Sequence, residues 1–327
     1  MRYTTKTIKI RTAPMMDWTD THCRYLFRLL SPRCMVYTEM LHVNAILHGN
    51  ANKLLAFHPK ETPVALQLGG NNANDLAKCA KLGEDLGYSE INLNCGCPSD
   101  KVVKGAFGAG LMTNPTKVGQ CVEKMVESVS IPVTVKHRLG LGIESKYHYV
   151  YEFVDTIRKF GCHTFIVHAR NAILGTLSPK ENREIPPLHY DYVTQLKKDF
   201  PDLTFVLNGG IRTVNEAIDK ISRHDGIMIG RAAYQDPYIL RQIEHRLYNT
   251  PLVSRADIAL EMEKYVADQL NKGTSSRSVL KCMLGLFRKQ PYGKLWRQLL
   301  TKPEAILEFG PGVISYAVDR IHSPHLI

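Results

Sequence analysis

Short apolar segments alternate with amphipathic ones over roughly the first three quarters of the chain. The apolar segments are rich in β-branched side chains and are bounded by Gly, Pro or Asn, which is typical of buried β-strands. The pattern predicts strands at residues 10–15, 35–40, 63–68, 90–95, 132–137, 164–169, 204–208 and 226–230.

Helical periodicity occupies the intervals between these strands, most clearly at residues 72–87, 114–129 and 149–160. Thr213, followed three residues later by Glu216, has the form of a capping box and predicts a helix start after the seventh strand. Eight strand–helix units in about 235 residues is the number and size of a (β/α)8 TIM barrel. An open doubly wound sheet is the rival fold, but no Gly-x-Gly-x-x-Gly motif follows the first strand.

The alternation stops near residue 245, where Asn249-Thr250-Pro251 interrupts the chain. No strand pattern appears after this point, and the sequence predicts helices at residues 255–272, 276–289, 294–301 and 312–321. We therefore expect a TIM-barrel domain over residues 1–245 and a small all-helical domain over residues 246–327.

Charge is distributed unevenly between these two parts. The formal net charge is +11, and residues 269–303 contain eight basic residues and no acidic one. The basic residues are Lys272, Arg277, Lys281, Arg288, Lys289, Lys294, Arg297 and Lys302. Phe287, Tyr292 and Trp296 lie among them, which suits phosphate contacts with stacking on bases. A solvated helix face is the alternative interpretation.

Composition and cysteine usage are those of an ordinary globular protein, with 44% hydrophobic and 22% charged residues. No apolar run approaches the ~18 residues that a membrane span needs, so we expect no membrane partner. The eight cysteines are scattered, and Cys95 and Cys97 are separated by one residue, unlike the common zinc and redox spacings. This usage predicts reduced thiols in a cytoplasmic protein and no metal site.

Chemistry in a TIM barrel is found at the carboxyl ends of the strands, where this sequence places polar residues and glycines. Asn208-Gly209-Gly210 follows the seventh strand and Gly230-Arg231 follows the eighth. Glycines let backbone N–H groups approach an anion closely, and Arg231 adds positive charge. The pair predicts a phosphate site, the alternative being that the glycines only close tight turns.

Three other strand-end residues are candidates for chemistry. Lys136 suits a Schiff-base nucleophile, a general acid or a fixed cation beside an electron-rich cofactor, the alternative being a paired structural lysine. His168 suits a hydrogen bond to a phosphate or a ring, or a purely structural polar contact. Cys97, in a Gly-Cys-Pro turn, suits an exposed nucleophile or proton donor, whereas most cysteines are small core residues.

The ordered set of these motifs resembles the tRNA-dihydrouridine synthases over the whole chain. The motifs are Ala13-Pro14-Met15-Met16-Asp17, Gln67-Leu68-Gly69, Asn92-Leu93-Asn94-Cys95-Gly96-Cys97-Pro98, Val135-Lys136, His168-Ala169-Arg170, Asn208-Gly209-Gly210 and Gly230-Arg231. Residues 177–183, with Phe107-Gly108-Ala109, resemble the bacterial subfamily that acts at D-loop positions 20 and 20a. Cys95 departs from the pattern, because a small aliphatic residue is expected there.

The resemblance implies an FMN-dependent enzyme that reduces the C5=C6 bond of uridine in tRNA with NADPH. It implies that Cys97 gives the proton to C5, and that the flavin ring and ribityl chain are held by Pro14, Met15, Met16, Gln67, Lys136 and His168. The implied phosphate ligands are Asn208, Gly209, Gly210, Gly230 and Arg231. The implied tRNA contacts are Asn94, Arg183, Lys294 and Arg297.

Three other functions stay open at this point. A flavin barrel that reduces a small pyrimidine-like substrate explains the strand ends but not the basic helical region. A Lys136 Schiff-base aldolase and a non-catalytic RNA-binding barrel are the others, and the second leaves Cys97 without a role. A monomer suffices for a tRNA groove shared by the two domains, and the preference for NADPH over NADH is inferred from the family alone.

Overall fold

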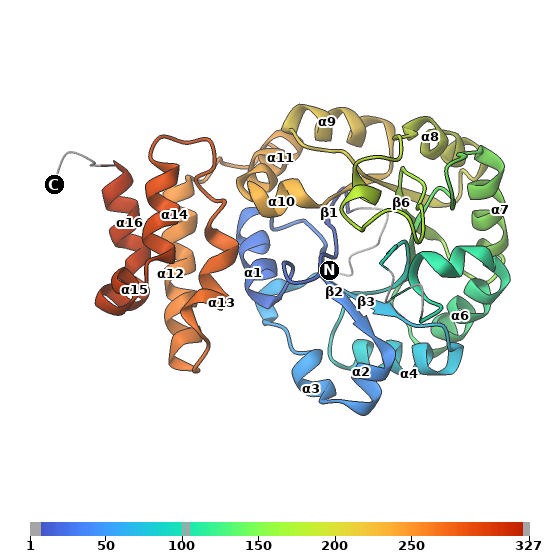
Figure 1. The fold of residues 1–327 in the computed structure, drawn as a ribbon, viewed down its shortest axis with the longest axis horizontal. Helices are drawn as coiled ribbons and strands as arrows, with labels where there is room; N and C mark the ends of the chain where they lie inside the picture. The colour runs from blue at the N-terminus through green and yellow to red at the C-terminus, as the bar shows by residue number, and fades with distance from the viewer. Residues whose placement is uncertain (1–7, 100–101, 103–104, 323–327) are drawn as a thin grey trace.

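The computed structural model describes residues 8–99, 102 and 105–322. Within these residues, eight parallel strands form a barrel surrounded by helices, with a further helical region beside it (Figure 1). The strands are β1 (Ile10–Thr12), β2 (Val36–His42), β3 (Val64–Gly69), β4 (Glu90–Cys95), β5 (Val133–Arg138), β6 (Thr164–His168), β7 (Thr204–Asn208) and β8 (Gly226–Ile229). All eight predicted strands are confirmed.

The sheet closes on itself. Its hydrogen-bonded order is β1-β8-β7-β6-β5-β4-β3-β2. The remaining gap, between β1 and β2, is bridged where Thr12 N–H donates to Met35 O at 3.0 Å and Met35 N–H donates to Ile10 O at 3.0 Å. The predicted (β/α)8 TIM barrel is therefore confirmed, and all the strands direct their carboxyl ends to one mouth.

Helices cover the outside of the barrel, as the amphipathic intervals predict. They are α1 (Thr21–Leu30), α2 (Val43–His48), α3 (Ala51–Leu54), α4 (Ala73–Asp85), α6 (Pro115–Ser128), α7 (Tyr147–Arg158), α8 (Tyr190–Asp199), α9 (Val214–Arg223), α10 (Arg231–Gln235) and α11 (Tyr238–Tyr248). The short 3-10 turns between strands include η1 (Pro59–Glu61), η2 (Gly108–Thr113) and η3 (Glu181–Arg183). The capping box predicted at Thr213 and Glu216 begins α9.

Successive side chains of a strand point to opposite faces, so one set lies inside the barrel and the other lies between the strands and the helices. Along β4, Ile91, Leu93 and Cys95 belong to the apolar core between strands and helices. The alternate residues Asn92 and Asn94 make hydrogen bonds to side chains of β3 and β5 inside the barrel. The barrel interior of this protein is therefore partly polar.

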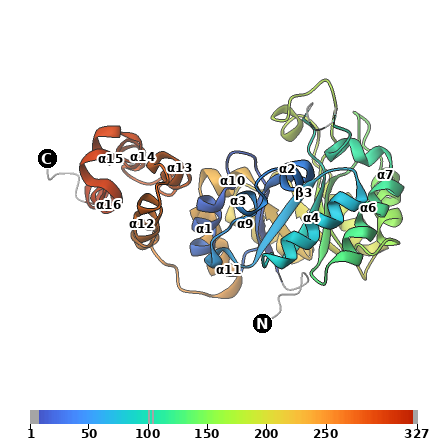
Figure 2. The ribbon, with the colours of Figure 1, turned by 90° about the horizontal axis from the view of Figure 1, so that it is seen from below.

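The C-terminal region consists of helices, as predicted. They are α12 (Arg255–Asn271), α13 (Ser276–Leu280), the turn η4 (Lys281–Met283), α14 (Gly293–Thr301), α15 (Pro303–Phe309), the turn η5 (Gly310–Gly312) and α16 (Val313–His322). Both views place this region beside α1 (Figure 1, Figure 2). Among the described residues no helix is long and apolar enough to span a bilayer.

Two details differ from the sequence prediction. The helix expected at 276–289 ends at Leu280 and continues as the turn η4. Beyond this turn, Gly285 packs so closely on the barrel that a Cβ there would lie 2.5 Å from Gln235 O. The helix α15, with Pro303 in its first turn, was not predicted.

The predicted division at residue 245 lies inside α11, which continues to Tyr248 and ends at the left-handed residue Asn249. The division into two domains stays a prediction. Its outer parts, residues 1–7 and 323–327, lie outside the described residues.

Aromatic and ionic contacts join the helical region to the barrel. The Tyr265 ring of α12 stacks on Tyr25 of α1 at a centroid distance of 3.9 Å, and its hydroxyl lies 2.8 Å from His22 Nδ1. Lys281 Nζ lies 2.7 Å from Asp20 Oδ2 and donates to Asp17 O at 3.1 Å. The last two contacts connect the helical region to the β1–α1 loop at the barrel mouth.

The proposed stacking of aromatic residues on bases is wrong for two of the three residues. Trp296 is fully buried, and its ring packs against that of Phe287 at a centroid distance of 4.6 Å. Its indole N–H donates to Met283 O at 3.0 Å. Both rings belong to the apolar core. Tyr292 is 46% exposed and stays available to a partner.

This difference in burial predicts that two aromatic substitutions change stability by very different amounts. Trp296→Ala removes a buried ring and its hydrogen bond, so we expect the free energy of unfolding to fall by about 3–5 kcal/mol. Tyr292→Ala, at an exposed position, serves as the control and should change it by less than about 0.5 kcal/mol. Urea unfolding followed by circular dichroism measures both. Equal losses would contradict the placement of the two rings.

Candidate active site

The strand register brings most of the predicted site residues together at the barrel mouth. Asn94 of β4 pairs with Lys136 of β5. On the next strand pairs, Arg138 pairs with His168, and His168 pairs with Asn208. Residues that are more than a hundred positions apart in the sequence therefore form one continuous rim.

The ends of β1 and β8 complete this rim. A Cβ on Gly230 would lie 3.8 Å from Met15 Sδ, so Met15 and Gly230 are neighbours. The Met15 backbone is held on both sides by Thr19, whose hydroxyl accepts from Met15 N–H at 2.9 Å and lies 3.1 Å from Met15 O. Pro14 is half-buried, whereas Met16 is 56% exposed.

Glycine is required after β7 by both conformation and space. Gly209 and Gly210 have φ values of +113° and +73°, which side chains rarely tolerate. A Cβ on Gly209 would lie 2.8 Å from His168 Cδ2, and one on Gly210 would lie 2.5 Å from Leu188 Cδ1. Tyr190 fixes the turn by donating its hydroxyl hydrogen to Gly209 O at 2.8 Å. The turn thus presents bare backbone to the mouth.

Arg231 begins α10 and reaches across to the β6–α8 loop. One guanidinium nitrogen lies 2.5 Å from Glu184 Oε1, and another donates to Arg183 O at 3.3 Å. Glu184 therefore offsets part of the Arg231 charge, and this hydrogen bond lowers the pKa of the Glu184 carboxyl.

The mouth is electropositive, and two of its groups show the effect. Within the described residues, Lys136 has no hydrogen bond and no ion pair, and burial followed by repulsion from Arg138 lowers its pKa to about 7. Burial, and then repulsion from the surrounding cations, lowers the pKa of His168 well below its ordinary value. These cations are Arg138, Lys136, Arg170 and Arg183. An anion bound here would relieve the repulsion.

Arg138 joins two loops at the mouth, a role that the sequence did not predict. Its Nε donates to Gly96 O at 3.0 Å, and one Nη donates to Asn171 O at 2.9 Å and Asn182 O at 2.8 Å. It thus joins the loop of Cys97 to the β6–α8 loop. The sequence feature that could have indicated this role is the position of Arg138 two residues after Lys136, on the same face of β5.

The two neighbouring thiols have different environments. Cys97 is half-buried in the β4 turn, donates its N–H to Asn94 Oδ1 at 2.8 Å and places Sγ 3.6 Å from Ser99 Oγ. Cys95 is fully buried between β4 and the helices, and burial raises its pKa far above the ordinary thiol value. The other six cysteines are buried as well, so Cys97 is the thiol at the mouth.

The four residues predicted to contact tRNA differ in their exposure to solvent. Arg183, Lys294 and Arg297 are exposed, the last two on one face of α14. Asn94 is only 8% exposed, and its amide donates to Gln67 Oε1 at 2.8 Å while accepting from the Cys97 turn. Asn94 is therefore directed into the barrel rather than outward.

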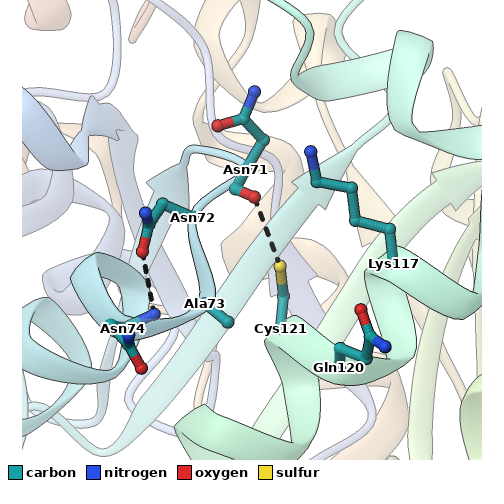
Figure 3. Close-up of a pocket in the computed structure, with 7 residues that line it drawn as sticks. All are labelled: Asn71, Asn72, Ala73, Asn74, Lys117, Gln120 and Cys121. Atoms are coloured by element: carbon teal, nitrogen blue, oxygen red, sulfur yellow. Dashed lines mark hydrogen bonds between the residues drawn. The ribbon is translucent and has the colours of Figure 1, made fainter.

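A separate cavity of about 280 Å³ lies between the β3–α4 loop and α6 (Figure 3). It is lined by Asn71, Asn72, Ala73, Asn74, Lys117, Gln120 and Cys121, none of which is a predicted site residue. Asn71 links this wall to the loop that follows Cys97, because its Nδ2 donates to Ala106 O at 3.1 Å.

The fold and the mouth define a TIM-barrel protein whose electropositive mouth contains one partly exposed thiol. The family model described as dihydrouridine synthase (Dus) matches residues 11–311. The chain belongs to the dihydrouridine synthase family, which is flavin-dependent in general. This result confirms the resemblance drawn from the ordered motifs.

Individual relatives support the same assignment over nearly the whole chain. A protein of Vibrio cholerae serotype O1 is 47% identical over 97% of this chain and 98% of its own length. A protein of Xylella fastidiosa is 50% identical over 90% of this chain and 87% of its own, and one of Synechocystis sp. is 46% identical over 97% and 96%. All three are named tRNA-dihydrouridine(20/20a) synthase.

The lowered pKa of Lys136 predicts how stability depends on pH. The folded protein without ligand disfavours the charged ammonium, whereas the unfolded chain accepts it up to its ordinary pKa. Lys136→Met should therefore be more stable than wild type below pH 7. This advantage should shrink by at most about 1.4 kcal/mol per pH unit as pH rises from 7 to 10.

Urea unfolding of both ligand-free proteins at pH 6.5 and pH 9 measures this difference. A Lys136→Met advantage that does not change with pH would contradict a desolvated, unpartnered ammonium at this position.

Proposed function

We propose that this protein is an FMN-dependent tRNA-dihydrouridine synthase that reduces uridines 20 and 20a of the D loop with NADPH. Relatives that carry this activity in their names are 46–50% identical over at least 90% of the chain. The observation that supports it most directly is the Cys97 thiol at the rim of an electropositive barrel mouth, where an acid is needed to complete the reduction.

The residues of the mouth fit a flavin phosphate and an electron-rich ring. The backbone of the Gly209-Gly210 turn is left bare by its conformation, and the repulsion among the mouth cations favours an anion. We assign the phosphate to Asn208, Gly209, Gly210, Gly230 and Arg231. The ring and ribityl chain are assigned to Pro14, Met15, Met16, Gln67, Lys136 and His168.

Reduction of the C5=C6 bond needs a hydride donor and a proton donor. When bound, reduced FMN supplies the hydride that adds to C6 of the uracil ring. Negative charge then develops at C5 in conjugation with C4=O, and the Cys97 S–H supplies the proton to C5. The resulting thiolate recovers a proton from solvent. General acid catalysis of this kind accelerates a reaction by roughly 10²–10⁴-fold.

Lys136 supplies positive charge where the cofactor becomes negative. In the ligand-free mouth its pKa is about 7, so a large fraction of the side chain is neutral near physiological pH. An anion beside it favours the ammonium form and holds its proton in place. We therefore propose for Lys136 the role of fixed cation beside the cofactor, rather than that of Schiff-base nucleophile or general acid.

The helical region supplies the surface for tRNA. Of the eight cations in residues 269–303, five are exposed and have no acidic partner among the described residues: Arg277, Lys289, Lys294, Arg297 and Lys302. Lys272 and Lys281 are neutralised by Asp268 and Asp20, which lie outside the acid-free run. The target uridine leaves its stack and enters the barrel mouth. A small pyrimidine substrate, the alternative, leaves these cations unused.

We further propose that the protein acts as a cytoplasmic monomer. Eight cysteines without disulfides suit a reducing compartment. The contacts of Tyr265 and Lys281 hold the helical region of the same chain beside the mouth, so a second copy is not needed to complete the site.

Cys97→Ala tests the assigned proton donor. We expect flavin content and flavin reduction by NADPH to stay within about 2-fold of wild type, and reoxidation of the reduced flavin by tRNA to slow by roughly 10²-fold or more. Stopped-flow absorbance of the flavin measures both half-reactions, and dihydrouridine mapping at positions 20 and 20a measures the product. A wild-type protein that never binds flavin would overturn the proposed function.

Lys294→Ala combined with Arg297→Ala tests the tRNA surface. Loss of two phosphate contacts should weaken tRNA binding and reduce the slope of log K against log salt by roughly 1.5, without affecting flavin reduction by NADPH. Lys124→Ala with Lys159→Ala removes the same charge from ion-paired positions on α6 and beside α7, and serves as the control. Equal weakening by both double variants would show a response to net charge alone.

A further inference from the structure

A chain of hydrogen bonds crosses the barrel interior and ends at the mouth. Thr134 Oγ1 donates to Glu90 Oε1 at 2.7 Å and accepts from Asn92 Nδ2 at 2.8 Å. Asn92 Oδ1 accepts from Gln67 Nε2 at 2.7 Å, and Gln67 Oε1 accepts from Asn94 Nδ2 at 2.8 Å. All five side chains are buried, and they alternate among β3, β4 and β5.

The direction of this chain is set at its inner end. Glu90 is fully buried, and its Oε2 lies 3.8 Å from the equally buried guanidinium of Arg11. The hydroxyls of Tyr37 and Thr134 both donate to Glu90 Oε1. Because a threonine hydroxyl has a single hydrogen, Thr134 can only accept from Asn92.

The same logic orients each amide in turn. Once the nitrogen of Asn92 points to Thr134, its oxygen must face Gln67, and the Gln67 oxygen must face Asn94. The Asn94 oxygen is then left to accept two backbone N–H groups, from Gly96 at 3.0 Å and Cys97 at 2.8 Å. A reversed Asn94 amide would direct its own N–H groups at these two donors.

We propose that Thr134, Asn92 and Glu90 are positioning residues for Cys97, which they hold through Gln67 and Asn94. This inference rests on the proposed role of Cys97 as the proton donor. One buried acceptor, Glu90, thereby sets through one hydroxyl and three amides the orientation of the Asn94 side chain that holds the turn carrying the thiol. The nearest of these three residues to the mouth, Asn92, is separated from Cys97 by two side chains, so none needs to touch the substrate.

Thr134→Val breaks the chain with little change of shape, and Thr134→Ser restores the hydroxyl. In the flavin-free protein without tRNA, we expect backbone amide exchange at residues 96 and 97 to accelerate by about 10-fold in Thr134→Val, which is the effect of losing one hydrogen bond. Thr134→Ser should stay within about 2-fold of wild type. Hydrogen exchange read by mass spectrometry measures this.

Tyr37→Phe is the matched control. It also removes a hydroxyl that donates to Glu90, but this hydroxyl is not on the path to Asn94. We expect a loss of global stability without faster exchange at residues 96 and 97. In the loaded enzyme, Thr134→Val should slow flavin reoxidation by tRNA by about 10-fold and leave reduction by NADPH within about 2-fold.

Unchanged exchange at residues 96 and 97 in Thr134→Val, or equal acceleration in Thr134→Ser and Tyr37→Phe, would overturn the inference. If Thr134→Val does not fold, Asn94→Ala removes the last acceptor at the mouth, and unchanged exchange there is equally decisive against it. Wild-type protein that forms no dihydrouridine would instead overturn the proposed function. One result overturns the positioning role alone. In it the wild-type enzyme is active, Cys97→Ala is inactive, and Thr134→Val has the activity of wild type.

Discussion

The closed ring of parallel strands is the constraint on which the other features of this protein depend. Since every strand in the ring runs the same way, each one brings its last residues to a single mouth. Lys136 and Arg138 come from β5, and Arg170 and Arg183 from the β6–α8 loop, yet their charges all act on one histidine there. Burial, and then repulsion between these cations, lowers the pKa of Lys136 and His168. An anion at the mouth would relieve this repulsion, which supports the proposed binding of an anionic cofactor.

The same ring encloses a polar interior that differs from an ordinary apolar barrel core. Glu90 and Arg11 form a buried charged pair, and the hydrogen bonds above them lead outward to the mouth. Buried polar groups of this kind are costly when unsatisfied, and among the described residues Glu90 Oε2 accepts no hydrogen bond. The amides of Asn92 and Gln67 are hydrogen-bonded on both sides, which restricts each to one orientation. Rigidity at the Cys97 turn thus depends on residues that lie well below it, while Cys95, one pleat away, faces the apolar helix layer.

One face of α14 is buried and the other is exposed. Trp296 and Leu300 anchor one face in the core, which leaves Lys294 and Arg297 on the exposed face. The contacts of the helical region with α1 and with the β1–α1 loop hold that exposed face in a constant position relative to the mouth. Such a fixed spacing suits a folded RNA substrate, which must dock at one place and present a base at another.

Local patterns in the sequence were sufficient for the strands, their order and the barrel, because period-two alternation and Gly or Pro boundaries are properties of neighbouring residues. They also identified Lys136, His168 and the glycine turns, since strand ends in a barrel share one mouth. They could not distinguish the environments of Cys95 and Cys97, the inward direction of Asn94, the burial of Trp296 or the pairing of Lys281 with Asp20. Each of these depends on which distant surface a side chain meets, and that is settled only when the strands close and the helices pack.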